Sequence, residues 1–187
     1  MMIPLYYSLV FIIFLFLGIS IKLIDVFYNP KLNQKQLILL SIICGLLIGI
    51  LISIDYYLAP LLLGIVFAVA ITKKIDNFAF RLGTLIIFLI LIIVYLNERI
   101  AFNFPLLLIF TIAGAIDEIG NDLADCKKLS GFLKWFFDYR FLLKVTVIAV
   151  FLLGMFPLPY VLDFFAFDLS YILFELIYDK KLKLSVF

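Results

Sequence analysis

GAIDEIGNDLAD, residues 114–125, follows directly on an apolar run and decides how the rest of the chain is interpreted. On a helix, where successive residues are about 100° apart, its acids and Asn121 fall within an arc of about 140°. The four acids are Asp117, Glu118, Asp122 and Asp125. Ile116, Ile119 and Leu123 fall together on the opposite side. The stretch therefore predicts a membrane helix that emerges into water with one acidic face.

Composition indicates that lipid is the solvent for most of the chain. Of the 187 residues, 67% are hydrophobic and 15% are charged, and the mean hydropathy is +1.27. A soluble domain has about 45–50% apolar and about 25% charged residues. Too little polar surface is available here to cover the apolar side chains in water. We therefore expect an all-α, polytopic integral membrane helix bundle that forms one transmembrane domain over residues 1–187.

The residue inventory excludes several kinds of chemistry. There is no histidine, so Ser-His-Asp and Cys-His catalysis, histidine metal sites and imidazole proton relays are excluded. The two cysteines, Cys44 and Cys126, provide neither a disulfide framework nor a thiolate zinc site. No phosphate-binding glycine loop and no basic stripe of the nucleic-acid-binding type is present. We expect the bilayer, and no nucleic acid, as a partner; the sequence does not indicate an oligomeric state.

Seven apolar segments approach the length of about 20 residues that a transmembrane helix needs. They cover residues 3–24, 37–54, 58–72, 78–96, 100–116, 141–156 and 160–178. The last segment carries three acids, so we expect six or seven crossings. Residues 129–137 mix aromatic side chains with lysines, which predicts a short cytoplasmic helix in the membrane interface. Seven glycines are interpreted as helix-packing positions: Gly18, Gly45, Gly49, Gly64, Gly83, Gly114 and Gly154.

The distribution of basic residues predicts the orientation. With seven crossings, every one of the fifteen Lys and Arg residues except Arg99 falls on the same side. The positive-inside rule assigns that side to the cytoplasm. We therefore expect a multi-pass protein of the cell membrane whose N-terminus is outside and whose C-terminus is cytoplasmic.

The same topology gathers carboxylates and cations at the cytoplasmic ends of the spans. Clustered carboxylates without histidine suit a hard cation such as Mg²⁺, and nearby Lys and Arg suit phosphate groups. The predicted metal ligands are Asp117, Glu118, Asp122 and Asp125. The predicted phosphate-binding residues are Lys73, Lys74, Arg81, Lys127 and Lys128. Together they predict a Mg²⁺-assisted enzyme acting on a lipid phosphate or diphosphate, although ordinary solvated loop residues would give the same pattern.

One short motif resembles a known family. NDLAD, residues 121–125, resembles part of the aspartate-rich motif of membrane-embedded prenyltransferases of the UbiA type. The resemblance implies that these acids hold Mg²⁺ and an isoprenyl diphosphate. It covers five residues of a chain much shorter than that family's nine-helix bundle. Asp25 is followed by Asn29 and Pro30 without the acid repeat of the family's second motif.

Two other functional classes stay open. Asp168 and Glu175 are seven residues apart and share a helix face, and acids inside a span indicate a cation or proton path. They would serve a small cation transporter, a proton-coupled transporter or a channel. Asp163 lies near the segment boundary, and we interpret it as water-exposed. The third class is a non-catalytic membrane scaffold.

Overall fold

The computed structural model describes residues 2–28, 34–97 and 103–185, with side chains over 5–28, 34–97 and 103–178. Within these ranges the chain forms eight α-helices and no strand. The helices are α1 (Met2–Phe27), α2 (Lys35–Ile54), α3 (Leu58–Ile71), α4 (Phe78–Leu96), α5 (Phe104–Asp125), α6 (Gly131–Asp138), α7 (Phe141–Leu152) and α8 (Leu158–Ser185). Several predicted features lie outside the described residues: the loop at Asn29, Pro30 and Lys31, the turn at Glu98 and Arg99 with the start of the fifth span, and the side chains of Lys180, Lys181 and Lys183.

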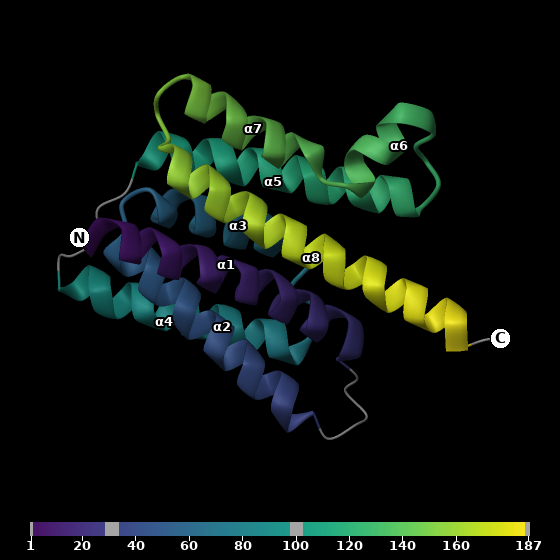
Figure 1. Cartoon of the computed structure of the whole chain (residues 1–187), viewed down its shortest axis with the longest axis horizontal. Helices are drawn as coiled ribbons and strands as arrows, with labels where there is room; N and C mark the ends of the chain where they lie inside the picture. The colour runs from purple at the N-terminus through teal and green to yellow at the C-terminus, as the bar shows by residue number, and fades with distance from the viewer. Residues whose placement is uncertain (1, 29–33, 98–102, 186–187) are drawn as a thin grey trace.

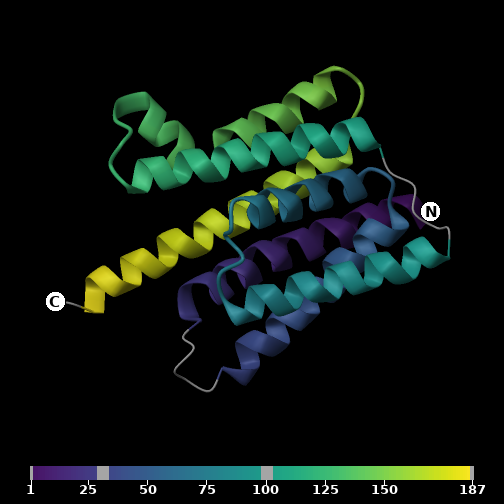
Figure 2. The ribbon, with the colours of Figure 1, turned by 180° about the vertical axis from the view of Figure 1, so that it is seen from behind.

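The long helices run roughly side by side, so the bundle has two ends (Figure 1). The closest pairings are α2 with α4, α3 with α5, and α1 with α8, while α7 lies along α5. Viewed from behind, α4 and α3 cover the face opposite to α8 (Figure 2). The end that carries α6 is called the α6 end below. The opposite end, which carries the α2–α3 turn at Asp55, is called the Asp55 end.

Glycines set the close helix pairings, as the sequence predicts. A Cβ on Gly45 of α2 would lie 2.6 Å from the carbonyl oxygen of Gly83 on α4. A Cβ on Gly64 of α3 would lie 2.7 Å from the Cβ of Phe110 on α5. Both distances are too short for a real side chain, so glycine is needed where these backbones approach. Gly154 is an exception, because its φ is +71° and a Cβ there would meet open space. It forms the turn after α7 rather than a packing contact.

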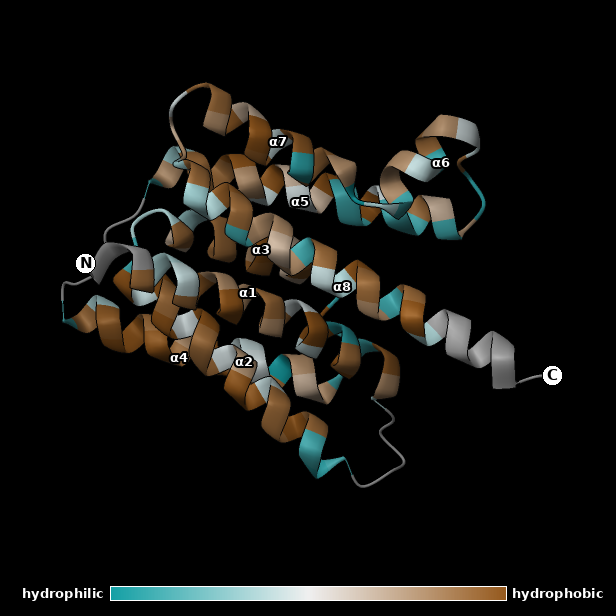
Figure 3. Ribbon diagram, viewed as in Figure 1, coloured by the Kyte–Doolittle hydropathy of each residue, from teal (hydrophilic) through white to brown (hydrophobic). Residues whose placement is uncertain are grey.

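The helix surfaces match a lipid environment. Four helices, α1, α2, α4 and α5, are long and apolar enough to cross a membrane, while α3 and α7 are shorter apolar helices. Each of the eight helices exposes at least one large apolar side chain. Apolar residues predominate along the helices, as the ribbon coloured by hydropathy shows (Figure 3). The chain is therefore a membrane-associated helical protein. Pro105 lies inside the predicted segment 100–116. It occupies the first turn of α5, where a proline removes no intrahelical hydrogen bond.

The predicted interfacial segment is the helix α6 (Gly131–Asp138). It is exposed on most sides, and Phe132, Leu133 and Trp135 are among its exposed side chains. Phe137 packs on α5 over Gly120, where a Cβ would collide with the aromatic ring. The glycine therefore fixes where α6 rests on α5.

Candidate functional site: a charged network at the α6 end

The first two acids of the acidic face of α5 point into the bundle rather than into water. This corrects the prediction that the whole acidic face emerges into water. Asp117 and Glu118 are buried, whereas Ile116, Ile119 and Leu123 are exposed. The predicted angular separation of the two sets holds, but the isoleucines and the leucine face outward. Lipid is the better solvent for these apolar side chains, and neighbouring helices supply donors and cations to the acids. The carboxylates face water only towards the end of α5.

Asp117 joins α5 to the start of α7. Its carboxylate accepts hydrogen bonds from the backbone N–H of Leu142 at 3.1 Å and of Leu143 at 2.6 Å. The first N–H groups of a helix have no intrahelical partner, and a negative charge there is favoured by the helix dipole. Asp117 is only 1% exposed, so its carboxylate depends on these two donors. The residue therefore acts as a cap supplied by another helix.

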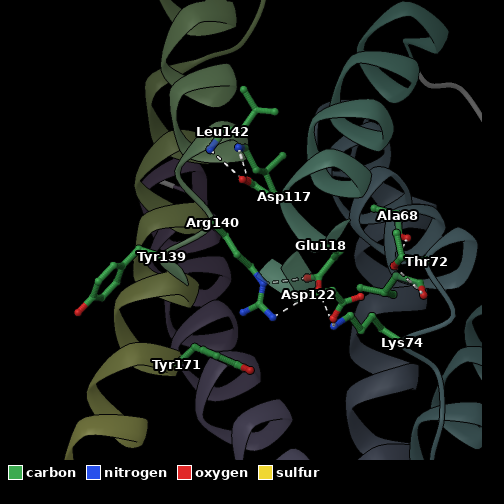
Figure 4. Close-up of polar contacts among 12 residues, drawn as sticks. Ala68, Thr72, Lys74, Asp117, Glu118, Asp122, Tyr139, Arg140, Leu142 and Tyr171 are labelled. Atoms are coloured by element: carbon green, nitrogen blue, oxygen red, sulfur yellow. Dashed lines mark hydrogen bonds and ion pairs between the residues drawn. The ribbon is translucent and has the colours of Figure 1, made fainter. Parts of the chain in front are cut away.

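Glu118 and Asp122, on the following turns of α5, form ion pairs with two cations from other segments (Figure 4). Nε of Arg140 lies 2.9 Å from Oε1 of Glu118, and Nη2 donates to Oε2 at 3.4 Å. Nζ of Lys74, just after α3, lies 4.0 Å from Glu118 and pairs directly with Asp122. Glu118 is thus held between two cations that come from the α6–α7 and α3–α4 connections.

Arg140 remains charged under all ordinary conditions. Burial lowers the pKa of its guanidinium, but the Glu118 carboxylate and Tyr171 raise it by more, so that the net pKa lies above the ordinary value. The Tyr171 ring lies 6.0 Å from the guanidinium carbon, and Figure 4 shows it beside Arg140. Arg140 has a left-handed backbone with φ of 49°. That conformation is costly for a side chain other than glycine, so the surrounding contacts must hold it in place.

Tyr171 extends the network to α1. Lys22 is only 7% exposed, and its Nζ lies 4.7 Å from the centre of the Tyr171 ring. The same Nζ lies 2.9 Å from Glu175 on α8 and 3.5 Å from Asp25 one turn along α1. A buried lysine in an apolar helix needs such a partner, because an isolated ammonium group is very costly to remove from water. Five separate segments therefore meet in one charged network.

A second buried lysine pairs α7 with α8. Lys144 is 7% exposed and its Nζ lies 3.0 Å from Asp168. The same amine donates to the carbonyl oxygen of Tyr139, just before α7. Asp168 and Glu175, the predicted transport residues, each contact a buried lysine from a different helix, but Asp168 is mostly buried whereas the Glu175 side chain is 45% exposed.

The predicted metal ligands separate into two pairs. Asp117 and Glu118 are buried and engaged with α7 and Arg140, whereas Asp122 and Asp125 are exposed. Among the residues that the structure describes, no group of three or more His, Cys, Asp or Glu side chains is arranged to hold a metal ion. Four of the five predicted phosphate-binding residues have exposed side chains, namely Lys73, Arg81, Lys127 and Lys128. Lys74 is the member of that set that pairs with the α5 acids.

The sequence interpretation missed the cations that organise this network. Lys22, Arg140 and Lys144 were used only to predict orientation, yet each holds acids from a distant segment. The sequence position of two of these cations could have revealed their role, because Lys22 and Lys144 have mostly apolar neighbours in the chain. A cation embedded in an apolar run predicts a buried partner.

A second polar cluster lies at the Asp55 end. The Asp55 carboxylate accepts from the hydroxyls of Tyr6 at 2.6 Å and Tyr160 at 2.9 Å, and from two backbone N–H groups that start α3. Asp163, one turn beyond Tyr160, is only 2% exposed. The interpretation of Asp163 as water-exposed is therefore wrong. The packing of α8 against α1 turns this face of α8 inward, which the sequence of α8 alone does not reveal.

Comparisons with models of protein families, with characterised proteins and with solved structures found no match to this chain.

Proposed function

We propose that this protein is a membrane-embedded enzyme, a transferase or hydrolase, that acts on a lipid phosphate or diphosphate at the α6 end. The observation that carries the proposal is the exposed pair of acids Asp122 and Asp125 on the last turns of α5, with Lys74 paired to Asp122. Residues three apart on a helix are neighbours, so both carboxylates lie on one surface. Acids and a cation side by side suit a metal-bridged phosphate.

Magnesium does not require a preformed cage of protein ligands. It usually binds through one or two carboxylates, keeps several waters, and takes its other ligands from substrate phosphates. Asp122 and Asp125 are sufficient for such a site, and the C-terminal end of α5 adds a favourable dipole for a cation. Asp117 and Glu118 are already engaged, so we assign them to positioning α7 and Arg140.

The lysines around this pair suit the phosphate itself. Lys74 lies against α5, and Lys127 and Lys128 follow that helix directly with exposed side chains. Charge-assisted hydrogen bonds from such cations to phosphate oxygens are about twice as strong as neutral ones. Lys73 and Arg81, exposed near the same connection, would extend the anion-binding surface. Metal and lysines together would neutralise the charge that develops on the leaving phosphate.

The orientation belongs to the same proposal. Seven crossings, with α6 in the interface, would put the α6 end in the cytoplasm because nearly all basic residues then lie there. A water-soluble co-substrate would arrive from that side, while the lipid chain of the substrate would stay in the bilayer. The mixture of exposed aromatic residues and lysines on α6 is typical of a helix that lies at such a boundary.

The test is Mn²⁺ binding by the purified full chain in detergent, measured by electron paramagnetic resonance with and without geranylgeranyl diphosphate. We expect the diphosphate to increase Mn²⁺ affinity, and Asp122→Asn to abolish the increase. Asp138→Asn is the matched control, because Asp138 is an exposed acid on the neighbouring helix α6. Equal Mn²⁺ binding by wild type and Asp122→Asn, with the diphosphate present, would refute the proposal.

A transporter is the second candidate, and two ion pairs made by buried lysines favour it. Lys144–Asp168 and Lys22–Glu175 place charges between helices of an apolar bundle, and intramembrane charges often mark ion or proton paths. Proteoliposomes with an internal pH dye would show proton flux that Asp168→Asn eliminates. No flux above protein-free liposomes would exclude proton transport under those conditions.

A further inference from the structure

A depression of about 380 Å³ that is largely open to the outside, called the cavity below, lies between α1 and α8 near the Asp55 end. Tyr7, Ser8, Phe11 and Ile12 of α1 form one side. The other side is formed by residues of α8, namely Pro159, Leu162 and Asp163. The cavity is well separated from the charged network, because it lies near the start of α1 and α8 and the network lies near their other ends.

Asp163 is the unusual member of this lining. It is almost fully buried, and its Oδ2 has no hydrogen-bond donor within the part of the chain that the structure describes. No lysine or arginine among the described side chains forms an ion pair with it. Asp55 at the same end differs, because four donors satisfy its carboxylate. A buried carboxylate oxygen without a partner is costly, and a bound donor would remove that cost.

We propose that this cavity binds a small organic ammonium ion, with the ammonium group donating to the Asp163 carboxylate. The walls are apolar and aromatic, and a few polar groups in an apolar pocket of this size are typical of a small-molecule site. Tyr7 and Phe11 are aromatic residues of this lining, and the faces of aromatic rings attract organic cations. A metal ion would instead need several oxygen ligands, and no group of three acids is arranged for one among the described residues.

The exposed rim indicates where the ligand enters. Ile12 is 60% exposed and Leu162 is 53% exposed, so the cavity opens between two apolar side chains on the outer surface. An amine with a hydrocarbon body would partition into the bilayer and reach the cavity from the side. Its apolar part would contact the isoleucine and the leucine while its charge reaches Asp163.

The test uses phenethylamine as the probe and 2-phenylethanol as its neutral match, both with the purified full chain in a maltoside detergent. Equilibrium dialysis measures the affinity of each compound. Charge-assisted hydrogen bonds and cation–π contacts predict that the amine binds at least about tenfold more tightly than the alcohol. Asp163→Asn, which keeps the size of the side chain, should weaken amine binding by at least about tenfold. Asp138→Asn should leave it unchanged.

A second variant keeps the test decisive if Asp163→Asn does not fold. Ile12→Trp enlarges an exposed residue at the cavity mouth and should fold, because its side chain extends away from the core. It should reduce amine binding by obstructing entry. Unchanged amine binding in either folded variant, or equal binding of the amine and the alcohol to wild type, would overturn the proposal.

Discussion

Replacing Asp117 by asparagine tests whether the acidic stretch of α5 holds the bundle together. Asparagine has nearly the same shape but only one acceptor oxygen, so it can satisfy only one of the Leu142 and Leu143 amides. The other N–H, in a part-buried position, would lose its partner, at a cost of about 1–3 kcal/mol. Loss of the negative charge at the start of α7 adds up to about 2 kcal/mol. We expect a total near 3 kcal/mol, which is roughly a 100-fold change in the unfolding equilibrium.

The single tryptophan makes this change measurable. Trp135 packs against Phe141 with ring centroids 4.6 Å apart, directly before the capped turn of α7. Its fluorescence during titration with sodium dodecyl sulfate in mixed micelles would follow unfolding of this region. Asp125→Asn is the control, because Asp125 is an exposed acid on the same helix and should change stability by no more than about 0.5 kcal/mol. If both variants unfold at the same detergent fraction, the capping role of Asp117 is wrong.

Three further predictions concern the packing and the buried polar groups, and the same unfolding titration checks each one. Gly83→Ile should destabilise the fold by more than about 2 kcal/mol, because α2 leaves no space for a side chain there; stability like that of wild type would show that the two helices can separate freely. Tyr160→Phe should cost about 1–3 kcal/mol by removing one donor to the buried Asp55 carboxylate, and a smaller loss would mean that other donors compensate. Lys144→Met should cost about 2–4 kcal/mol by leaving Asp168 without its cation, and the double variant Lys144→Met/Asp168→Leu should recover most of that loss; additive losses would contradict the pairing.

Much of the fold could be predicted from the sequence because lipid imposes simple rules on helices. The segment 37–54 is apolar with polar residues at its ends, and the observed helix α2 covers Lys35–Ile54. Gly45 and Gly83 were predicted as packing positions because a bilayer helix has few other reasons to carry glycine in its interior. Both predictions depend only on the residues of the segment itself, so they need no knowledge of which other helices pack against it.

The candidate site could be predicted only in part, because its contacts join distant segments. The acidic arc of α5 follows from helix geometry, but the sequence does not show which neighbour lies against it. Arg140 approaches Glu118 because a turn with a left-handed residue brings the start of α7 back onto α5. Asp163 was placed in water because it lies near a segment end, yet packing of α8 on α1 buries it. Such burial depends on partners that no local pattern specifies.

The arrangement of α8 also bears on whether this helix crosses the bilayer. Its composition is too polar for it to be counted among the long apolar helices, since it carries Asp163, Asp168 and Glu175 within the described residues. Asp163 is buried and the Asp168 side chain is mostly buried, whereas the Glu175 side chain is 45% exposed. The other exposed side chains of α8 over residues 158–178 are leucine or isoleucine: Leu158, Leu162, Leu169, Leu173, Leu176 and Ile177. The outer surface of α8 is therefore mostly hydrocarbon, while Lys144 of α7 pairs with Asp168 inside the bundle and Lys22 of α1 pairs with Glu175 at its edge. Average hydropathy treats inward and outward residues alike, whereas the cost of insertion depends mainly on what the lipid contacts. Asp163 and Asp168 are therefore internal features of the bundle, whereas Glu175 lies at its edge beside the buried Lys22.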